Sequence, residues 1–247
     1  IMKKIIKKIY NKLFLSKRPD TINISDEYIN HLCYANAGFL HRGNLYLIDY
    51  AIKNMPANTC IVEIGVFCGL STNIISYYLK ANKKDYSIYN ADIWKLYTYD
   101  PEKKLGASEM THIDYCNILI STYKNNISLF SSIDNIFTFE LYSDNLFKLW
   151  EGESLKDLWN RTVSINEPIG FAYIDGSHLY EQAKKDFINV DHYLQKGGFI
   201  LFDDSSDDIY IKDDCEVSLL MKEIKSQYAD RYEVIAQNPN YLFRKLQ

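Results

Sequence analysis

The hydrophobic positions of this chain form short continuous runs and helical repeats in alternation. Continuous apolar runs fill residues 60–62, 171–174 and 199–202, as is typical of strands buried on both faces of a parallel sheet. Apolar residues at helical spacing follow the first two runs. Residues 231–237 and 241–246 have strand patterns separated by an Asn-Pro-Asn turn. This order predicts an α/β fold, with a Rossmann-like, mostly parallel sheet, helices on both faces and a C-terminal antiparallel hairpin.

The segments outside this alternation have less regular hydrophobic patterns. Residues 24–55 have mostly helical patterns, so we divide the chain into an N-terminal helical extension, 1–55, and a Rossmann-like domain, 56–247. Residues 2–18 form a basic amphipathic stretch, which either lies on an anionic membrane surface or packs on the domain or on a second subunit. Residues 95–135 form either a substrate lid or a surface excursion, and residues 145–166 have a helical pattern.

Composition excludes several classes of protein. The chain has 247 residues and a net charge of -4, which argues against a nucleic-acid partner, because phosphate binding needs a basic face. Five scattered cysteines without a Cys-x-x-Cys pair indicate thiols in a reducing compartment, so we expect a cytoplasmic protein. No apolar run is long enough to span a membrane.

The first buried run leads into a turn that suits a nucleoside ligand. The run ends in Glu63, and glycines follow at Gly65 and Gly69 before a helix begins near Ser71. A strand, a glycine turn and a helix N-terminus commonly bind a nucleoside or a phosphate-like group. The third glycine of the dinucleotide-binding pattern is missing, which disfavours a nicotinamide cofactor. An acid just before the first glycine suits a ligand that carries positive charge.

Two further strand ends carry polar residues. Asp92 follows the predicted second strand, where its two oxygens could accept hydrogen bonds from both ribose hydroxyls. The alternative is an aspartate that caps a helix or a turn. Ser143 follows the predicted third strand near 137–141, and we count it as a candidate cofactor contact.

Three carboxylates follow the remaining two buried runs. Asp175 ends one run, and Asp203 and Asp204 end its neighbour. Such charges at one sheet edge repel one another, and a divalent cation such as Mg²⁺ would relieve the repulsion. The alternative is that the acid-rich run is solvated or caps a loop. His178 lies one turn after Asp175 and is a candidate base, or else a structural hydrogen-bonding residue.

These motifs together resemble a known family. Glu-x-Gly-x-x-x-Gly is similar to the first motif of class I S-adenosylmethionine-dependent methyltransferases. Ile-Asp-Gly-Ser-His-x-Tyr, followed by a helix, Gly-Gly, a strand and Asp-Asp, resembles the metal-dependent macrocin-type O-methyltransferases. The resemblance covers about residues 59–204. Serines replace the aromatic residue that often follows Asp-Asp in relatives, and residues 95–135 and 145–168 do not match.

The resemblance implies a seven-stranded sheet in the order 3-2-1-4-5-7-6, an S-adenosylmethionine cofactor and methylation of a sugar hydroxyl. It also implies roles for individual residues. These are metal binding by Asp175, Asp203 and Asp204, proton removal by His178 or Asp175, and cofactor binding by Glu63, Gly65, Gly69, Ser71, Asp92, Trp94 and Ser143.

We therefore predict a methyltransferase that uses S-adenosylmethionine and Mg²⁺ or another divalent cation. The expected acceptor is a sugar or glycosylated small molecule. One alternative is a metal-independent enzyme of the same fold. Another is a non-catalytic nucleoside-binding module recruited through residues 2–18. In each case the protein could be a homo-oligomer.

Overall fold

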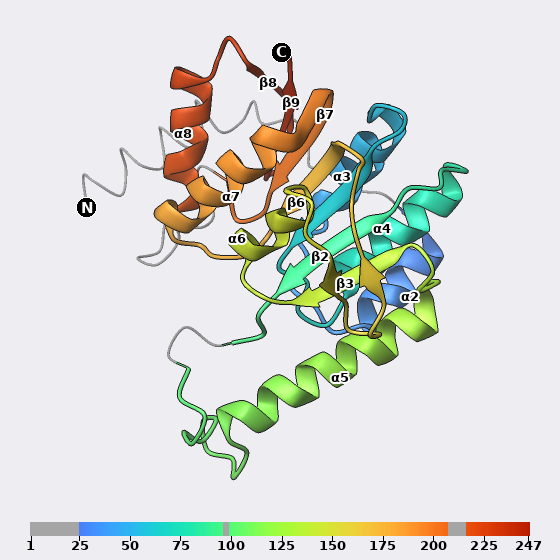
Figure 1. Cartoon of the computed structure of the whole chain (residues 1–247), viewed down its shortest axis with the longest axis vertical. Helices are drawn as coiled ribbons and strands as arrows, with labels where there is room; N and C mark the ends of the chain where they lie inside the picture. Colours follow the sequence, from blue (N-terminus) through green and yellow to red (C-terminus); the bar gives the residue numbers. More distant parts are fainter. Residues whose placement is uncertain (1–24, 96–98, 207–215) are drawn as a thin grey trace, which may run out of the picture.

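A seven-stranded sheet forms the centre of the molecule. The computed structural model describes residues 25–95, 99–206 and 216–247 (Figure 1). The strands are β1 (Cys60–Ile64), β2 (Ile88–Asp92), β3 (Ile136–Glu140), β6 (Ile169–Ile174), β7 (Leu194–Phe202), β8 (Tyr232–Gln237) and β9 (Tyr241–Lys245). Their spatial order is β3-β2-β1-β6-β7-β9-β8; β9 pairs antiparallel with both β7 and β8, and the other pairs are parallel. The predicted fold class is confirmed.

Helices cover both faces of this sheet. On one face lie α2 (Glu27–Ala35), α3 (Asn44–Asn54), α4 (Leu70–Ala81) and α5 (His112–Phe130). On the other lie α6 (Ser143–Leu146), the 3-10 helix η2 (Phe147–Leu149), α7 (Tyr180–Tyr193) and α8 (Val217–Gln227). Among the described residues, no helix combines the length and apolarity needed to cross a membrane.

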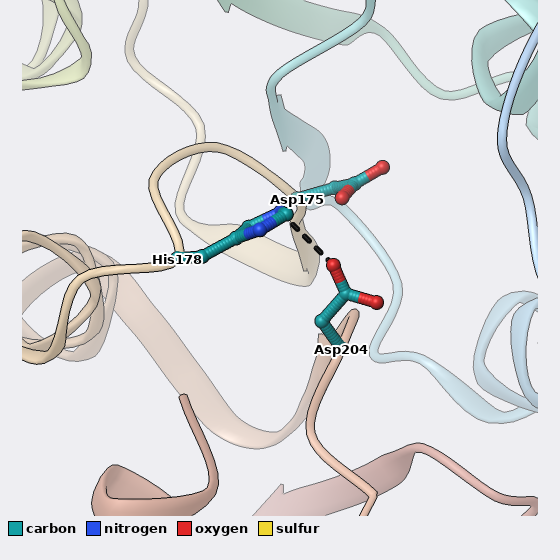
Figure 2. Close-up of side chains that lie close together, drawn as sticks. All are labelled: Asp175, His178 and Asp204. Atoms are coloured by element: carbon teal, nitrogen blue, oxygen red, sulfur yellow. Dashed lines mark ion pairs between the residues drawn. The ribbon is translucent and has the colours of Figure 1, made fainter. Parts of the chain in front are cut away.

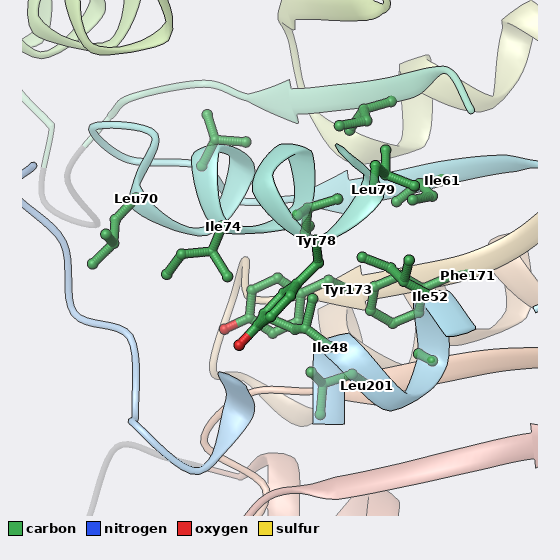
Figure 3. Close-up of a cluster of buried hydrophobic side chains, with 14 of the residues drawn as sticks. Ile48, Ile52, Ile61, Leu70, Ile74, Tyr78, Leu79, Phe171, Tyr173 and Leu201 are labelled. Carbon is green, nitrogen blue, oxygen red and sulfur yellow. The ribbon is translucent and has the colours of Figure 1, made fainter. Parts of the chain in front are cut away.

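The continuous apolar runs are explained by two separate cores. Side chains of a strand alternate between faces, so Ile61 of β1 joins the core under α3 and α4 (Figure 3). Val62 and Ile64 join the core under α7 on the other face. β1 is therefore buried along its whole length. Burial on both faces is why this strand is apolar at nearly every position rather than at every second one.

The N-terminal helices form part of the first core. Ile29 and Leu32 of α2, together with Ile48 and Ile52 of α3, are fully buried in the same cluster as β1 and β6. The domain boundary at residue 55 stays a prediction. Residues 2–18 lie outside the described part of the chain, so their expected contact with a membrane or a second subunit also stays a prediction.

The helical prediction for residues 145–166 is wrong beyond the first turns. After η2 the chain forms a hairpin of β4 (Leu155–Lys156) and β5 (Thr162–Val163). Asp157 closes this hairpin by accepting hydrogen bonds from the backbone and side chain of Arg161. Trp150 packs against Tyr193 at the end of α7. The distant contact of Trp150 with Tyr193 outweighs the local helical pattern, which alone could not reveal it.

Candidate active site

The candidate site lies at the carboxyl edge of the four central strands. The backbone nitrogens of Gly65, Asp175 and Asp203 each donate a hydrogen bond to the strand beside them, over 2.8–2.9 Å. Their acceptors are Ala91, Ile64 and Ile174, respectively. Because neighbouring strand ends are bonded in this way, residues far apart in the sequence meet at one edge.

Gly65 is required by the close approach of two strand ends. Its φ is +82°, and a Cβ atom there would lie 2.0 Å from the carbonyl oxygen of Asp175. Any side chain would therefore collide with backbone that cannot move aside. The second glycine, Gly69, has φ +87° at the start of α4 and packs beside Tyr123 of α5. Gly65 thus shapes the site, whereas Gly69 allows the chain to enter the helix.

Two adjoining cavities open at this edge. The first has a volume of about 490 Å³ and is lined by Phe67, Ser71, His178, Asp203 and Asp204, among others. The second has a volume of about 480 Å³ and extends over the ends of β2 and β3 toward α7. Gly65, Asp92 and Asp175 line both. Each volume is in the range of small-molecule sites, and the shared residues let one elongated ligand occupy both cavities.

The acids expected to hold the cofactor differ in their access to the cavities. Asp92 lies at the junction, where its Oδ2 accepts hydrogen bonds from the backbone of Val66 and Phe67, both at 2.9 Å. It therefore also fixes the glycine turn. Glu63 is fully buried, lines neither cavity and accepts a hydrogen bond of 2.6 Å from Thr72. Burial raises the pKa of Glu63 to about 7, although the hydroxyls of Ser71 and Thr72 oppose the shift.

Trp94 lies away from both cavities. Only 4% of its surface is exposed, and its Nε1 donates a hydrogen bond of 2.7 Å to the carbonyl of Phe67. Its ring packs against Tyr123 of α5. Ser143, in contrast, lines the second cavity, and its hydroxyl donates to Asp186 over 2.6 Å. The structure thus shows Trp94 as a support for the glycine turn and Ser143 as part of a cavity wall.

The side chains of Asp175, His178 and Asp204 converge at the first cavity (Figure 2). Each offers a ligand atom, and these atoms all lie within 4.8 Å of one another. His178 Nε2 and Asp204 Oδ2 are 2.9 Å apart. Asp204 has φ +49°, an uncommon conformation for a residue other than glycine, which the surrounding contacts must maintain.

Asp203 occupies a different position from its neighbour Asp204. Its Oδ1 accepts hydrogen bonds from the side-chain amides of Asn44, at 2.7 Å, and Asn240. Asn44 also donates to the hydroxyl of Tyr173, which lies 3.5 Å from Oδ2 of Asp175. Asp203 is therefore anchored by α3 and by the turn before β9. It lines the cavity but does not belong to the group formed by Asp175, His178 and Asp204.

The carboxylates strongly perturb one another. Burial and the charges of Asp203 and Asp204 raise the pKa of Asp175 well above its ordinary value. Burial also raises the pKa of Asp203. The hydrogen bond to Asp204 raises the pKa of His178, although burial opposes the change. Two or three negative charges held together in this way favour a bound cation.

Several residues of the site have no signal in the sequence. Phe39, which is 89% exposed, lines the first cavity with its ring tilted against that of Phe67 and the ring centroids 5.4 Å apart. Asn44 and Asn240 reach Asp203 from opposite ends of the chain. Of residues 95–135, only Lys95 among those described lines either cavity, so the predicted lid stays a prediction.

Comparison with known proteins agrees with this architecture. The sequence model of a protein family described as "Methyltransferase domain" matches residues 62–205, more than half of the chain. The chain belongs to this methyltransferase family. The matched range spans both glycines, all the candidate metal ligands and the candidate base. A sequence search of curated proteins finds no match.

Solved structures share the fold of this methyltransferase. An O-methyltransferase from Bacillus cereus in complex with SAH is 13% identical, with a TM-score of 0.57, over 98% of this chain and 97% of that one. SAH-bound PaMTH1 from Podospora anserina is 12% identical, with a TM-score of 0.55, over 100% and 96%. TomG from Streptomyces achromogenes, in complex with SAM, is 10% identical, with a TM-score of 0.54, over 98% and 96%. Identities this low indicate a shared fold alone.

Proposed function

We propose that this methyltransferase transfers the methyl group of S-adenosylmethionine to a hydroxyl of a sugar or glycosylated small molecule, with a divalent cation at the site. The observation that carries the proposal is the convergence of Asp175, His178 and Asp204 beside the glycine turn. The convergence brings a potential cation site next to a cavity of cofactor size.

The cofactor is proposed to span both cavities. The nucleoside would lie in the second cavity and the amino acid half in the first, with Asp92 at the ribose between them. Two observations support this placement. Gly65, Asp92 and Asp175 line both cavities, and an acid at the end of the second strand suits ribose hydroxyls. The B. cereus enzyme and PaMTH1 contain SAH, and TomG contains SAM, in the same fold.

The donor set of the cluster suits a divalent cation. Two carboxylates provide the oxygen ligands that Mg²⁺ prefers, and an imidazole also suits transition metals such as Mn²⁺. Asp203 is predicted as a further ligand, and its Oδ1 is already engaged by two amides. When bound, the cation would act as a Lewis acid that lowers the pKa of the acceptor hydroxyl.

The protein itself would orient the acceptor and remove its proton. Asp204 holds the imidazole of His178 at 2.9 Å, as an orienting carboxylate does for a histidine base. His178 would accept the proton as the methyl group transfers if its imidazole is not a ligand of the cation, and Asp175 would accept it otherwise. Methyl transfer from a sulfonium needs mainly alignment, which the rigid strand ends would supply.

The opening of the first cavity suits an acceptor with an apolar face. Phe39 and Phe67 present two tilted rings beside the cavity, and Leu40 and Leu70 extend the apolar lining. Such rings could pack against the carbon-bound hydrogens of a sugar ring or against an aromatic group of the same small molecule. Screening free sugars, glycosides and phenols as acceptors would separate these classes.

Calorimetric titration with SAH, combined with methyl-transfer assays, tests the proposal. We expect Asp175→Ala to abolish turnover while leaving SAH affinity largely unchanged, and a chelator to stop the wild-type enzyme until Mg²⁺ or Mn²⁺ is restored. Glu140→Ala is the matched control, because Glu140 is an exposed acid at the end of β3 that lines neither cavity.

Three results would contradict parts of the proposal. Wild-type protein that binds neither SAM nor SAH would refute the cofactor. Full activity in excess chelator would favour the metal-independent alternative. Loss of SAH affinity in Asp175→Ala would give Asp175 a role in cofactor binding rather than in catalysis.

A further inference from the structure

The second cavity contains a buried acid that no motif of the sequence indicates. Asp186 lies in α7, with 1% of its surface exposed, yet it lines this cavity. Its Oδ1 accepts hydrogen bonds from the hydroxyl of Ser143, at 2.6 Å, and from the amide of Gln182, at 3.1 Å. Its Oδ2 is buried and accepts no hydrogen bond from any residue that the structure describes.

The free oxygen lies beside a residue of the cavity wall, Gly176. A Cβ atom placed on Gly176 would be 3.8 Å from Asp186 Oδ2, and Gly176 lines the same cavity. Leaving a buried carboxylate oxygen without a donor is unfavourable, so an atom of this kind that no protein group binds usually has a water, ion or ligand as its partner. That partner must donate a proton, because the oxygen of a carboxylate can only accept.

The rest of the cavity fits a flat heterocyclic base. Ile93, Leu141 and Leu179 provide apolar side chains after β2, after β3 and before α7. Asp92 lies at the junction with the first cavity, where the proposed function puts the ribose. A base attached to that ribose would extend between the apolar side chains toward α7.

We infer that Asp186 is the residue that selects adenine, with its Oδ2 accepting a hydrogen bond from the exocyclic amino group of the base. This inference rests on the proposed function, because it assumes that the cofactor's nucleoside occupies the second cavity. Ser143 and Gln182 act as positioning residues, since both bind Oδ1 and leave Oδ2 without a donor from the described residues. Burial raises the pKa of Asp186 to about 6, so the carboxylate is still an acceptor at neutral pH.

The selectivity follows from the direction of the hydrogen bond. Adenine carries an amino group that donates, whereas hypoxanthine carries an oxygen at the same position that can only accept. An oxygen facing Asp186 would leave two buried acceptors in contact without a proton between them. We therefore expect the wild-type protein to bind SAH roughly 10- to 100-fold more tightly than the analogue with hypoxanthine in place of adenine.

Asp186→Asn tests the inference with little change in shape. Ser143 and Gln182 both donate to the first oxygen, so they hold the amide with its oxygen toward them and its NH₂ toward the cavity. The variant would then present a donor where the wild type presents an acceptor. Calorimetric titration of the variant with SAH and with its hypoxanthine analogue should show that the ratio of the two dissociation constants falls at least tenfold, or that the analogue binds more tightly. Asp144→Asn is the control, because Asp144 is exposed and pairs with Asn189 outside the cavity, and it should keep the wild-type ratio.

The possible failures can be told apart. Wild-type protein that binds neither nucleoside would refute the proposed function. Wild-type protein that binds both equally, or an Asp186→Asn variant that keeps the wild-type ratio, would overturn the role of Asp186 while leaving the proposed function intact. The comparison within the wild type needs no variant, so the inference can be refuted even if Asp186→Asn does not fold.

Discussion

Glu63 should make the stability of this protein fall as pH rises toward neutrality. The side chain is fully buried, and its desolvation raises the pKa from 4.5 to about 7. In the unfolded chain the same carboxyl ionises near its ordinary value. Between these two pH values the folded state therefore holds a proton that the unfolded state has released, and each rise in pH favours unfolding.

The size of this effect follows from the two pKa values. The stabilisation is fully present below about pH 4.5 and is lost as pH rises through about 7. Integrating proton binding between about pH 5 and about pH 8 gives a loss of about 2.5 kcal/mol in the free energy of unfolding from this one residue. That is a large fraction of the 5–15 kcal/mol that stabilises a typical domain.

The assay is urea unfolding of the wild type and Glu63→Gln at about pH 5 and about pH 8. Glutamine does not titrate, so the variant should lose about 2.5 kcal/mol less than the wild type between these conditions. Contributions from Asp186 and from other titrating groups that do not interact with Glu63 are shared and cancel in the comparison. Glu140→Gln, at an exposed acid, should behave as the wild type does. Equal pH dependence in the wild type and Glu63→Gln would refute the reasoning.

Three further substitutions test other parts of the site. Gly65→Ala should lower the free energy of unfolding by roughly 1–2 kcal/mol because of the positive φ alone, and by more because the new Cβ overlaps the Asp175 carbonyl. An unchanged urea midpoint would contradict the close approach of the two strand ends. Asn240→Ala removes one of two amide donors to Asp203 and should lower the free energy of unfolding by about 1–3 kcal/mol, measured in the same way. Phe39→Ala should raise the KM for the acceptor about fivefold, for the loss of about 1 kcal/mol of apolar contact, without changing the Kd of SAH; a changed Kd would place Phe39 against the cofactor instead.

Local patterns were sufficient for most of the fold. β1, β6 and β7 were visible as continuous apolar runs because burial on both faces removes polar residues from a strand. The helical spacing after Asp175 predicted α7 for the same kind of reason. The helical prediction is wrong at residues 145–166, where Trp150 and Arg161 are held by partners far away in the sequence.

The sequence by itself determined that acids and glycines would stand at the ends of parallel strands. Parallel pairing brings those ends to one edge, so the meeting of Gly65, Asp92 and Asp175 followed from their positions alone. Only the tertiary structure decided the different surroundings of adjacent Asp203 and Asp204, and the presence of Asp186 in a cavity wall. Spacing along the chain specifies which strand end a residue occupies. The direction of its side chain and the identity of its partners depend on packing among elements that are distant in sequence.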